Sequence, residues 1–192
     1  ISGEHTASVY DIDLTGTMSL SRTISVARNR NEDGSASSRG VLNYLAGIRI
    51  APNGDYAWVV GKKDNTTRGA FFSENLQLTH DSTVRAQIVL IDLNNNTEDP
   101  SFAMDIDNSE SPTAIAFSEL GDYVFVTLQG NNQIAVIDLI NFMDPDSPGS
   151  VKTILQTGLA PQGLVIDPDS DKLYTNNFMG RSSTVHDLTS FF

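Results

Sequence analysis

Three carboxylates alternate with other residues in the sequence DPDSD (residues 167–171), and oxygen ligands at this spacing open a calcium-binding loop. The candidate ligands are Asp167, Asp169 and Asp171. The sixth position of such a loop should be Gly and is Lys172, and the twelfth should be acidic and is Phe178. The alternative is a β-turn between two strands, which the sequence favours because Pro presets φ and Asp favours a bend.

A long polar segment, residues 61–85, concentrates basic side chains, since it holds four of the 12 Lys and Arg residues of the chain. The candidate binding residues here are Lys63, Asp64, Asn65, Arg68 and Arg85. Their chemistry suits an anion or a partner protein, because Arg68 and Arg85 carry forked donors for carboxylates. Pairing with nearby Asp and Glu, which would hold the segment in place, is the alternative and commoner role for such residues.

The sequence KLYTNNFMGRSS (residues 172–183) indicates a hairpin, and Asn at its tip tolerates a positive φ. Asn176 and Asn177 are therefore expected to shape the turn. Asn177, Met179 and Arg181 are also candidates for contact with a partner.

Common catalytic arrangements are missing from the sequence. It contains no His-Glu-x-x-His pair, no P-loop, no dinucleotide fingerprint and no Gly-x-Ser-x-Gly elbow. The three His residues stand apart from one another, and an isolated His is more often structural than a metal ligand. We therefore expect a chain that is not itself an enzyme.

The composition argues against several classes of partner and site. The 24 acidic and 12 basic residues give a formal net charge of −12, which argues against nucleic acid, because binding to phosphates requires a positive surface. The chain has no Cys, which rules out disulfides, thiolate metal sites and c-type haem attachment within it. Its longest apolar runs are strand-length, so no transmembrane segment is expected.

The elements that position these residues repeat along the chain. Three segments, which start at residues 47, 113 and 162, each combine a short apolar strand, a polar turn and a second strand that contains Tyr56, Tyr123 or Tyr174 near its start. A third strand follows each time and ends near Asp92, Asp138 or Asp187, and a copy of it with Asp11 stands near the start of the chain. An Asp that recurs in this way is expected to bond a turn of its own repeat.

A weaker fourth strand is expected between units, in LSRTISVA, SFAMDID and VKTILQT. The third-strand Asp residues of the last three units lie 46 and 49 residues apart. Four short strands at this spacing are typical of the blades of a β-propeller. In DYVFVTLQ (residues 122–129) both alternating sets of side chains are largely apolar, as expected for a sheet packed between two neighbours.

The predicted fold is thus all-β, a partial β-propeller of about three and a half blades. The predicted blades are residues 1–46, 47–112 with the insertion 61–85, 113–161 and 162–192. Because an open arc would expose an apolar blade face at each end, we expect that further blades, in a ring of seven, or a second copy complete it.

At LYTNN, with VHDL ten residues further on, the unit resembles the YVTN family of bacterial β-propeller repeats, and YVFVTLQGNNQIAVIDL fits the same pattern. Two longer strings, residues 59–93 and 160–188, look like the propeller of exported bacterial proteins in which a c-type cytochrome region similar to di-haem peroxidases follows. The resemblance implies a periplasmic or cell-surface location. It also implies that any haem belongs to a region outside this sequence.

These features favour a noncatalytic binding or scaffold module that presents loops to a partner domain, a surface component or a small ligand. The first alternative is the propeller half of a cytochrome peroxidase-like or electron-transfer protein. A metal-dependent propeller hydrolase is the second alternative. No cofactor is expected within this chain, apart from calcium at the Asp residues named above.

Overall fold

The computed structural model describes residues 6–12, 18–26, 40–64, 85–106, 109–142, 151–167, 169 and 171–191, and strands make up most of them. They form four antiparallel sheets in which each strand pairs with the next along the chain. The N-terminal sheet consists of β1 (Thr6–Ile12) and β2 (Met18–Ser25). The first complete sheet consists of β3 (Val41–Ile50), β4 (Tyr56–Asp64), β5 (Arg85–Asp92) and β6 (Thr97–Ile106).

The second complete sheet consists of β7 (Pro112–Phe117), β8 (Tyr123–Leu128), β9 (Gln133–Asp138) and β10 (Val151–Gln156). The C-terminal sheet consists of β11 (Pro161–Asp167), β12 (Lys172–Asn177) and β13 (Ser182–Asp187). Two short helices join strands of the second complete sheet: the 3₁₀-helix η2 (Gln129–Asn131) and α1 (Leu139–Phe142).

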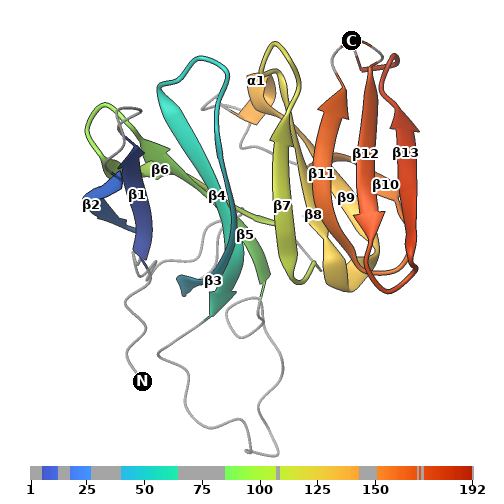
Figure 1. The fold of residues 1–192 in the computed structure, drawn as a ribbon, viewed down its shortest axis with the longest axis horizontal. Helices are drawn as coiled ribbons and strands as arrows, with labels where there is room; N and C mark the ends of the chain where they lie inside the picture. The colour runs from blue at the N-terminus through green and yellow to red at the C-terminus, as the bar shows by residue number, and fades with distance from the viewer. Residues whose placement is uncertain are drawn as a thin grey trace, which may run out of the picture.

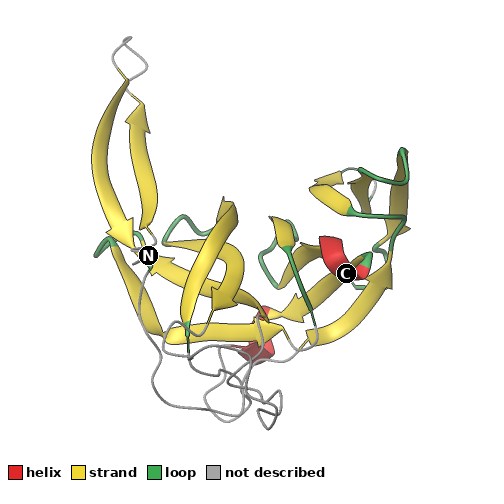
Figure 2. Ribbon diagram, turned by 90° about the horizontal axis from the view of Figure 1, so that it is seen from below, coloured by secondary structure: helices red, strands yellow, loops and turns green. Residues whose placement is uncertain are grey.

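The four sheets stand side by side in chain order (Figure 1) and follow an open arc when seen along their strands (Figure 2). The first strands of three sheets adjoin, because β7 contacts both β3 and β11. At the other edge of the sheets, β2 contacts β6. In these three sheets the innermost strand is therefore the first in sequence, and the later strands lie progressively further out.

Three apolar cores lie between successive sheets, because the middle strands are apolar on both faces. In β4, Val59 faces the N-terminal sheet and Trp58 and Val60 face the second complete sheet. In β8, Val124 faces back toward the first complete sheet and Phe125 faces the C-terminal sheet. This confirms the predicted burial of both faces, with each complete sheet contributing to two cores.

One backbone hydrogen bond recurs in three sheets and shows which of their residues are equivalent. Leu93, Leu139 and Leu188, each just after the third strand, donate their N–H to the carbonyl oxygens of Asp55, Asp122 and Asp171 at 2.7–2.9 Å. The residues that follow these Asp residues are Tyr56, Tyr123 and Lys172, which are therefore equivalent.

The predicted match of Tyr174 with Tyr56 and Tyr123 is wrong by two positions, since Tyr174 corresponds instead to Trp58 and Phe125. The strand register agrees, because Ala57, Val124 and Leu173 each pair with the end of a first strand. An aromatic residue is common anywhere in a strand, so it does not by itself determine the register.

The recurring third-strand Asp serves its own turn, as predicted. The Oδ1 of Asp92, Asp138 and Asp187 accepts the backbone N–H of the residue two or three positions later, at 2.8–3.3 Å. These hydrogen bonds favour the ionised carboxylate, and the pKa of Asp92 lies below its ordinary value chiefly because of the backbone N–H of Asn95. The side chain of Asp11 lies outside the described part of the structure.

Candidate functional site

In the part of the chain that the structure describes, the β8–β9 and β12–β13 turns, the β10–β11 connection and the end of the β6–β7 connection lie at the same end of the molecule, the lower end in Figure 1. We call this end the loop face. Within the described chain it comprises residues 109–111, 129–132, 157–160 and 178–181. Hydrogen bonds join these turns: Asn132 Oδ1 accepts the N–H of Ala160 at 2.8 Å, and the carbonyl of Ala160 accepts the N–H of Phe178 at 2.9 Å.

Two of the predicted binding residues of the segment 61–85 meet at its base. The strands extend into that segment, since β4 continues to Asp64 and β5 begins at Arg85, and Lys63 pairs with Arg85 across the two strands. Asn65 and Arg68 lie outside the described residues, as does the side chain of Asp64.

Lys63 lies inside the protein with no exposed surface, where its Nζ forms an ion pair with the buried carboxylate of Asp105. The other oxygen of that carboxylate, Oδ1, accepts a hydrogen bond from Gln87 Nε2 at 2.8 Å. Sequence reasoning missed Gln87 and Asp105 as members of this cluster, because Asp105 comes from a strand two positions further along the sheet. The cluster anchors the base of the β4–β5 connection and does not reach solvent through Lys63.

The β12–β13 turn brings the other two predicted residues into very different settings. Asn177 is buried, and its Nδ2 donates to Ser182 Oγ at 3.0 Å and to Thr184 Oγ1 at 2.9 Å. Asn176 Oδ1 accepts the N–H of Gly163 at 2.7 Å, where the pairing of β11 and β12 shifts register. Arg181, in contrast, is exposed at the end of the turn.

Large apolar side chains are exposed in the turn that contains Arg181 and in the adjoining turn of the loop face. Phe178 is 63% exposed, Met179 is 69% exposed, and Leu159 from the β10–β11 connection is 55% exposed. The N–H of Gly180 donates to the carbonyl of Leu159 at 3.2 Å, which holds the two turns together. Sequence reasoning had singled out Met179 and Arg181 but had not added Phe178 and Leu159, because Leu159 is remote in the sequence. We call Leu159, Phe178, Met179 and Arg181 the apolar–Arg patch.

The equivalent turn of the second complete sheet has a different character. Residues 129–132 and 178–181 both span four positions between paired strand ends, and the fourth residue of each has a left-handed φ, 57° at Asn132 and 49° at Arg181. The first turn reads Gln-Gly-Asn-Asn and the second Phe-Met-Gly-Arg. Since polar residues suffice to make this turn, turn formation does not require the apolar side chains or the Arg.

The predicted calcium ligands lie in the turn between β11 and β12. Asp167 Oδ1 accepts the N–H of Asp169 at 3.1 Å, which is the hydrogen bond of an Asx-turn. Asp171 has a φ of 48°, and its carbonyl accepts the N–H of Leu188. Among the residues that the structure describes, no three His, Asp or Glu side chains are grouped so that they could hold a metal ion. Calcium binding by these Asp residues remains a prediction.

The sheets and their radial order define the protein as a partial β-propeller, which confirms the predicted fold class. Solved structures agree. The chain is similar to hydrazine synthase from Kuenenia stuttgartiensis, with 16% identity and a TM-score of 0.60 over 77% of this chain. It is also similar to a protein from Lactobacillus plantarum, with 17% identity and a TM-score of 0.58 over 96% of this chain.

At such identities the likeness concerns the fold alone. The chain spans 46% of the length of each of these two proteins. No protein-family model and no curated protein sequence matches the chain. Within the described ranges, no helix is long and apolar enough to cross a bilayer.

Proposed function

We propose that this chain is a noncatalytic β-propeller module that binds a partner protein through its loop face. The observation that carries the proposal is the apolar–Arg patch, where Phe178, Met179 and Leu159 are each more than half exposed. Phe, Met and Arg are among the residue types enriched in protein–protein interfaces. Exposed apolar groups next to each other on a soluble domain commonly mark such a contact.

The chemistry of the patch suggests the kind of partner. Arg181 is exposed beside apolar side chains in a chain whose net charge is −12. A partner surface that offers an apolar centre and a carboxylate would bury Phe178 and Met179 and pair with Arg181. The acidic remainder of this chain would repel a partner with a large acidic surface. We therefore expect an apolar surface with few, localised carboxylates.

The test exchanges one turn for the other. Replacing Phe178-Met179-Gly180-Arg181 with Gln-Gly-Asn-Asn keeps the length and the backbone geometry of the turn and removes the patch. Wild-type and turn-swapped chains are immobilised, and proteins captured from the native host are quantified by mass spectrometry. A candidate partner is then purified, and its affinity for each chain is measured by calorimetry.

We expect the turn swap to weaken the affinity of the partner by at least about tenfold, because loss of an aromatic anchor and an Arg typically costs this much. Ile140→Ala is the matched control, since Ile140 is equally exposed but lies at the other end of the sheets. Equal affinity of the wild-type and turn-swapped chains for every purified candidate would contradict the proposal.

We further propose that the parent protein is an exported bacterial protein of the YVTN repeat type, in which the partner is a cytochrome domain or a surface component. The repeated strand motifs and the resemblance of the two longer strings to cytochrome-linked propellers support this setting. Reading the gene beyond codon 192 tests the redox connection, because c-type haem attachment requires Cys-x-x-Cys-His. A complete gene without this motif would remove the cytochrome domain from the same chain and leave a separate partner.

A further inference from the structure

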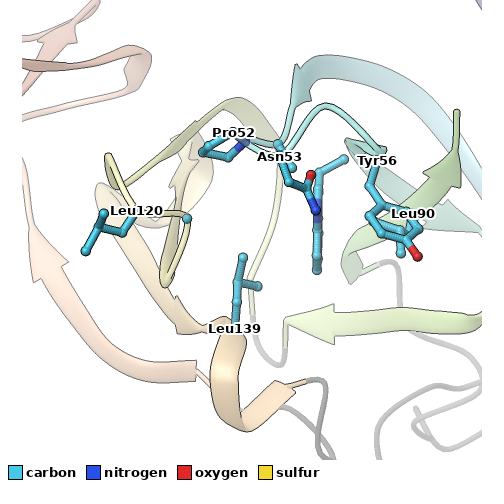
Figure 3. A pocket seen from close by; sticks show the side chains of 9 residues that line it. Pro52, Asn53, Tyr56, Leu90, Leu120 and Leu139 are labelled. Atoms are coloured by element: carbon cyan, nitrogen blue, oxygen red, sulfur yellow. The ribbon is translucent and has the colours of Figure 1, made fainter.

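A pocket lies between the two complete sheets at the end opposite the loop face (Figure 3). Its volume is about 130 Å³. The lining is mainly apolar and comes from two turns, two strands and α1: Ala51, Pro52, Asn53, Tyr56, Trp58, Leu90, Leu120, Gly121 and Leu139. Leu139 rises from α1 toward the opening, and Leu120, which is 80% exposed, stands at its rim.

The corresponding space at the next junction is filled by an aromatic ring. Phe191 packs edge-to-face against Tyr123, with ring centroids 5.7 Å apart, and against Phe125, with ring centroids 6.3 Å apart. By the alignment of the sheets, Tyr123 and Phe125 are the equivalents of Tyr56 and Trp58. The lining of the pocket thus includes the equivalents of two residues that pack against a phenyl ring at the next junction.

The size and chemistry of the pocket agree with this comparison. Apolar cavities of about 150 Å³ take up benzene, so a volume of 130 Å³ suits a single ring. At the rim, Asn53 Oδ1 accepts the N–H of Asp55 at 3.2 Å, and the Nδ2 of the same side chain has no hydrogen-bond partner among the described residues. Nδ2 is a donor for a hydroxyl oxygen on the ring. Asp55 and Asp122 adjoin the lining residues Tyr56 and Gly121 in the sequence, and their negative charges disfavour an anionic ring.

We propose that this pocket is a binding site for one uncharged aromatic ring. The ring belongs to a small molecule, and the competing occupant is a ring of the chain itself. Phe142 follows Asp138 in the sequence at the interval at which Phe191 follows Asp187. Its side chain lies outside the described part of the structure, so the experiment includes it as a separate arm. The proposal is independent of the loop face and does not rest on the proposed function.

Trp58 makes the test direct, because it is the only Trp of the chain and it lines the pocket. The full chain is titrated with p-cresol while the fluorescence of Trp58 is followed, and calorimetry checks the affinity. Cyclohexanol and benzoate are the comparison ligands. We expect saturable binding of p-cresol with a Kd on the order of 1 mM or below, and weaker binding of both comparison ligands.

Two exposed residues near this end supply matched variants. Leu120→Ala removes a wall of the pocket and is expected to weaken p-cresol binding several-fold. Ile140→Ala removes an exposed apolar side chain of α1 that does not line the pocket, and is expected to leave the affinity unchanged. Thermal unfolding of each variant establishes that it is folded before titration.

The last arm tests whether the chain's own ring fills the pocket. If the wild type does not bind p-cresol but Phe142→Ala does, the ring of Phe142 occupies the space and the proposal of a ligand site is overturned. Phe142→Leu replaces Phe142→Ala if the latter does not fold. The proposal is overturned if neither the wild type nor the Phe142 variant binds. It is also overturned if Leu120→Ala and Ile140→Ala weaken binding equally.

Discussion

At the scale of single residues, the buried ion pair of Lys63 and Asp105 differs from the other Lys–Asp pair of the described chain. Lys152 Nζ reaches Asp138 Oδ2 at 3.2 Å with 43% of the lysine side chain exposed, whereas the Lys63 pair is enclosed. An exposed pair contributes little to stability because water screens it. A buried pair is different, because loss of one partner leaves an uncompensated charge in the interior.

Asp105→Ala should therefore lower the free energy of unfolding by about 3–5 kcal/mol, because it leaves the Lys63 ammonium buried without its carboxylate. Lys63→Met combined with Asp105→Leu should cost clearly less, since both charges are gone. Urea unfolding measures these changes. Lys152→Ala, in the exposed pair, is the control and should cost about 0–1 kcal/mol. A double variant as unstable as Asp105→Ala would show that packing, and not charge, holds the cluster.

At the scale of elements, the β12–β13 turn places Arg at a position that favours Asn. Asn132 occupies the equivalent left-handed position in the second complete sheet and also accepts the N–H of Ala160. Asn tolerates this backbone region because its short polar side chain bonds locally, whereas Arg gains nothing there from the turn itself. The proposed contact of Arg181 with a partner gives a reason for its presence in spite of this cost.

Arg181→Asn should therefore raise the free energy of unfolding by about 0.5–1 kcal/mol while it weakens partner binding. The melting temperature checks the first effect, and Arg181→Lys, which keeps the backbone cost, should leave stability unchanged. A destabilised Arg181→Asn variant would mean that the guanidinium stabilises the fold, and would assign Arg181 a structural role.

The sequence predicted those elements whose signals are local. Two-sided apolar patterns such as that of Tyr123–Leu128 indicated packed sheets, and the recurring Asp indicated turns. The position of Tyr174 was missed by two residues, because only the hydrogen bond from Leu188 to Asp171 shows which residue opens the strand.

The site depended on distant contacts and was harder to predict. Lys63 looked like a surface residue, because its buried partner is 42 residues away in the sequence. The pocket beside Trp58 was missed altogether. Its lining residues are spread over positions 51–58, 90, 120–121 and 139, so no local pattern indicated it.

At the scale of the whole molecule, the outer face of the C-terminal sheet repeats the pattern of a buried junction. Tyr174 is equivalent to Trp58 and Phe125, which both pack against a following sheet. It lies between Val165, 59% exposed, and Val185, 51% exposed, in one row across three strands. This row therefore has the composition of a face that another sheet covers.

We expect the chain, when produced alone, to associate with a second copy through this row. Sedimentation velocity should show a larger species whose fraction rises with concentration. Val165→Lys combined with Val185→Lys should leave a folded monomer, because each Lys places a charge in the contact, whereas Ile140→Lys should associate as the wild type does. A wild type that stays monomeric up to about 100 µM, where even weak contacts of this size would form, would contradict the expectation.

The three cores between sheets determine which parts of the protein unfold first. Each complete sheet packs against neighbours on both faces, whereas the described end sheets pack on one. Cooperative loss of structure should begin at the ends of the arc and proceed inward, as in arrays stabilised by nearest neighbours. The amide protons of β4, β5, β8 and β9 would then exchange with solvent last. The two end sheets could therefore open while the two complete sheets stay folded.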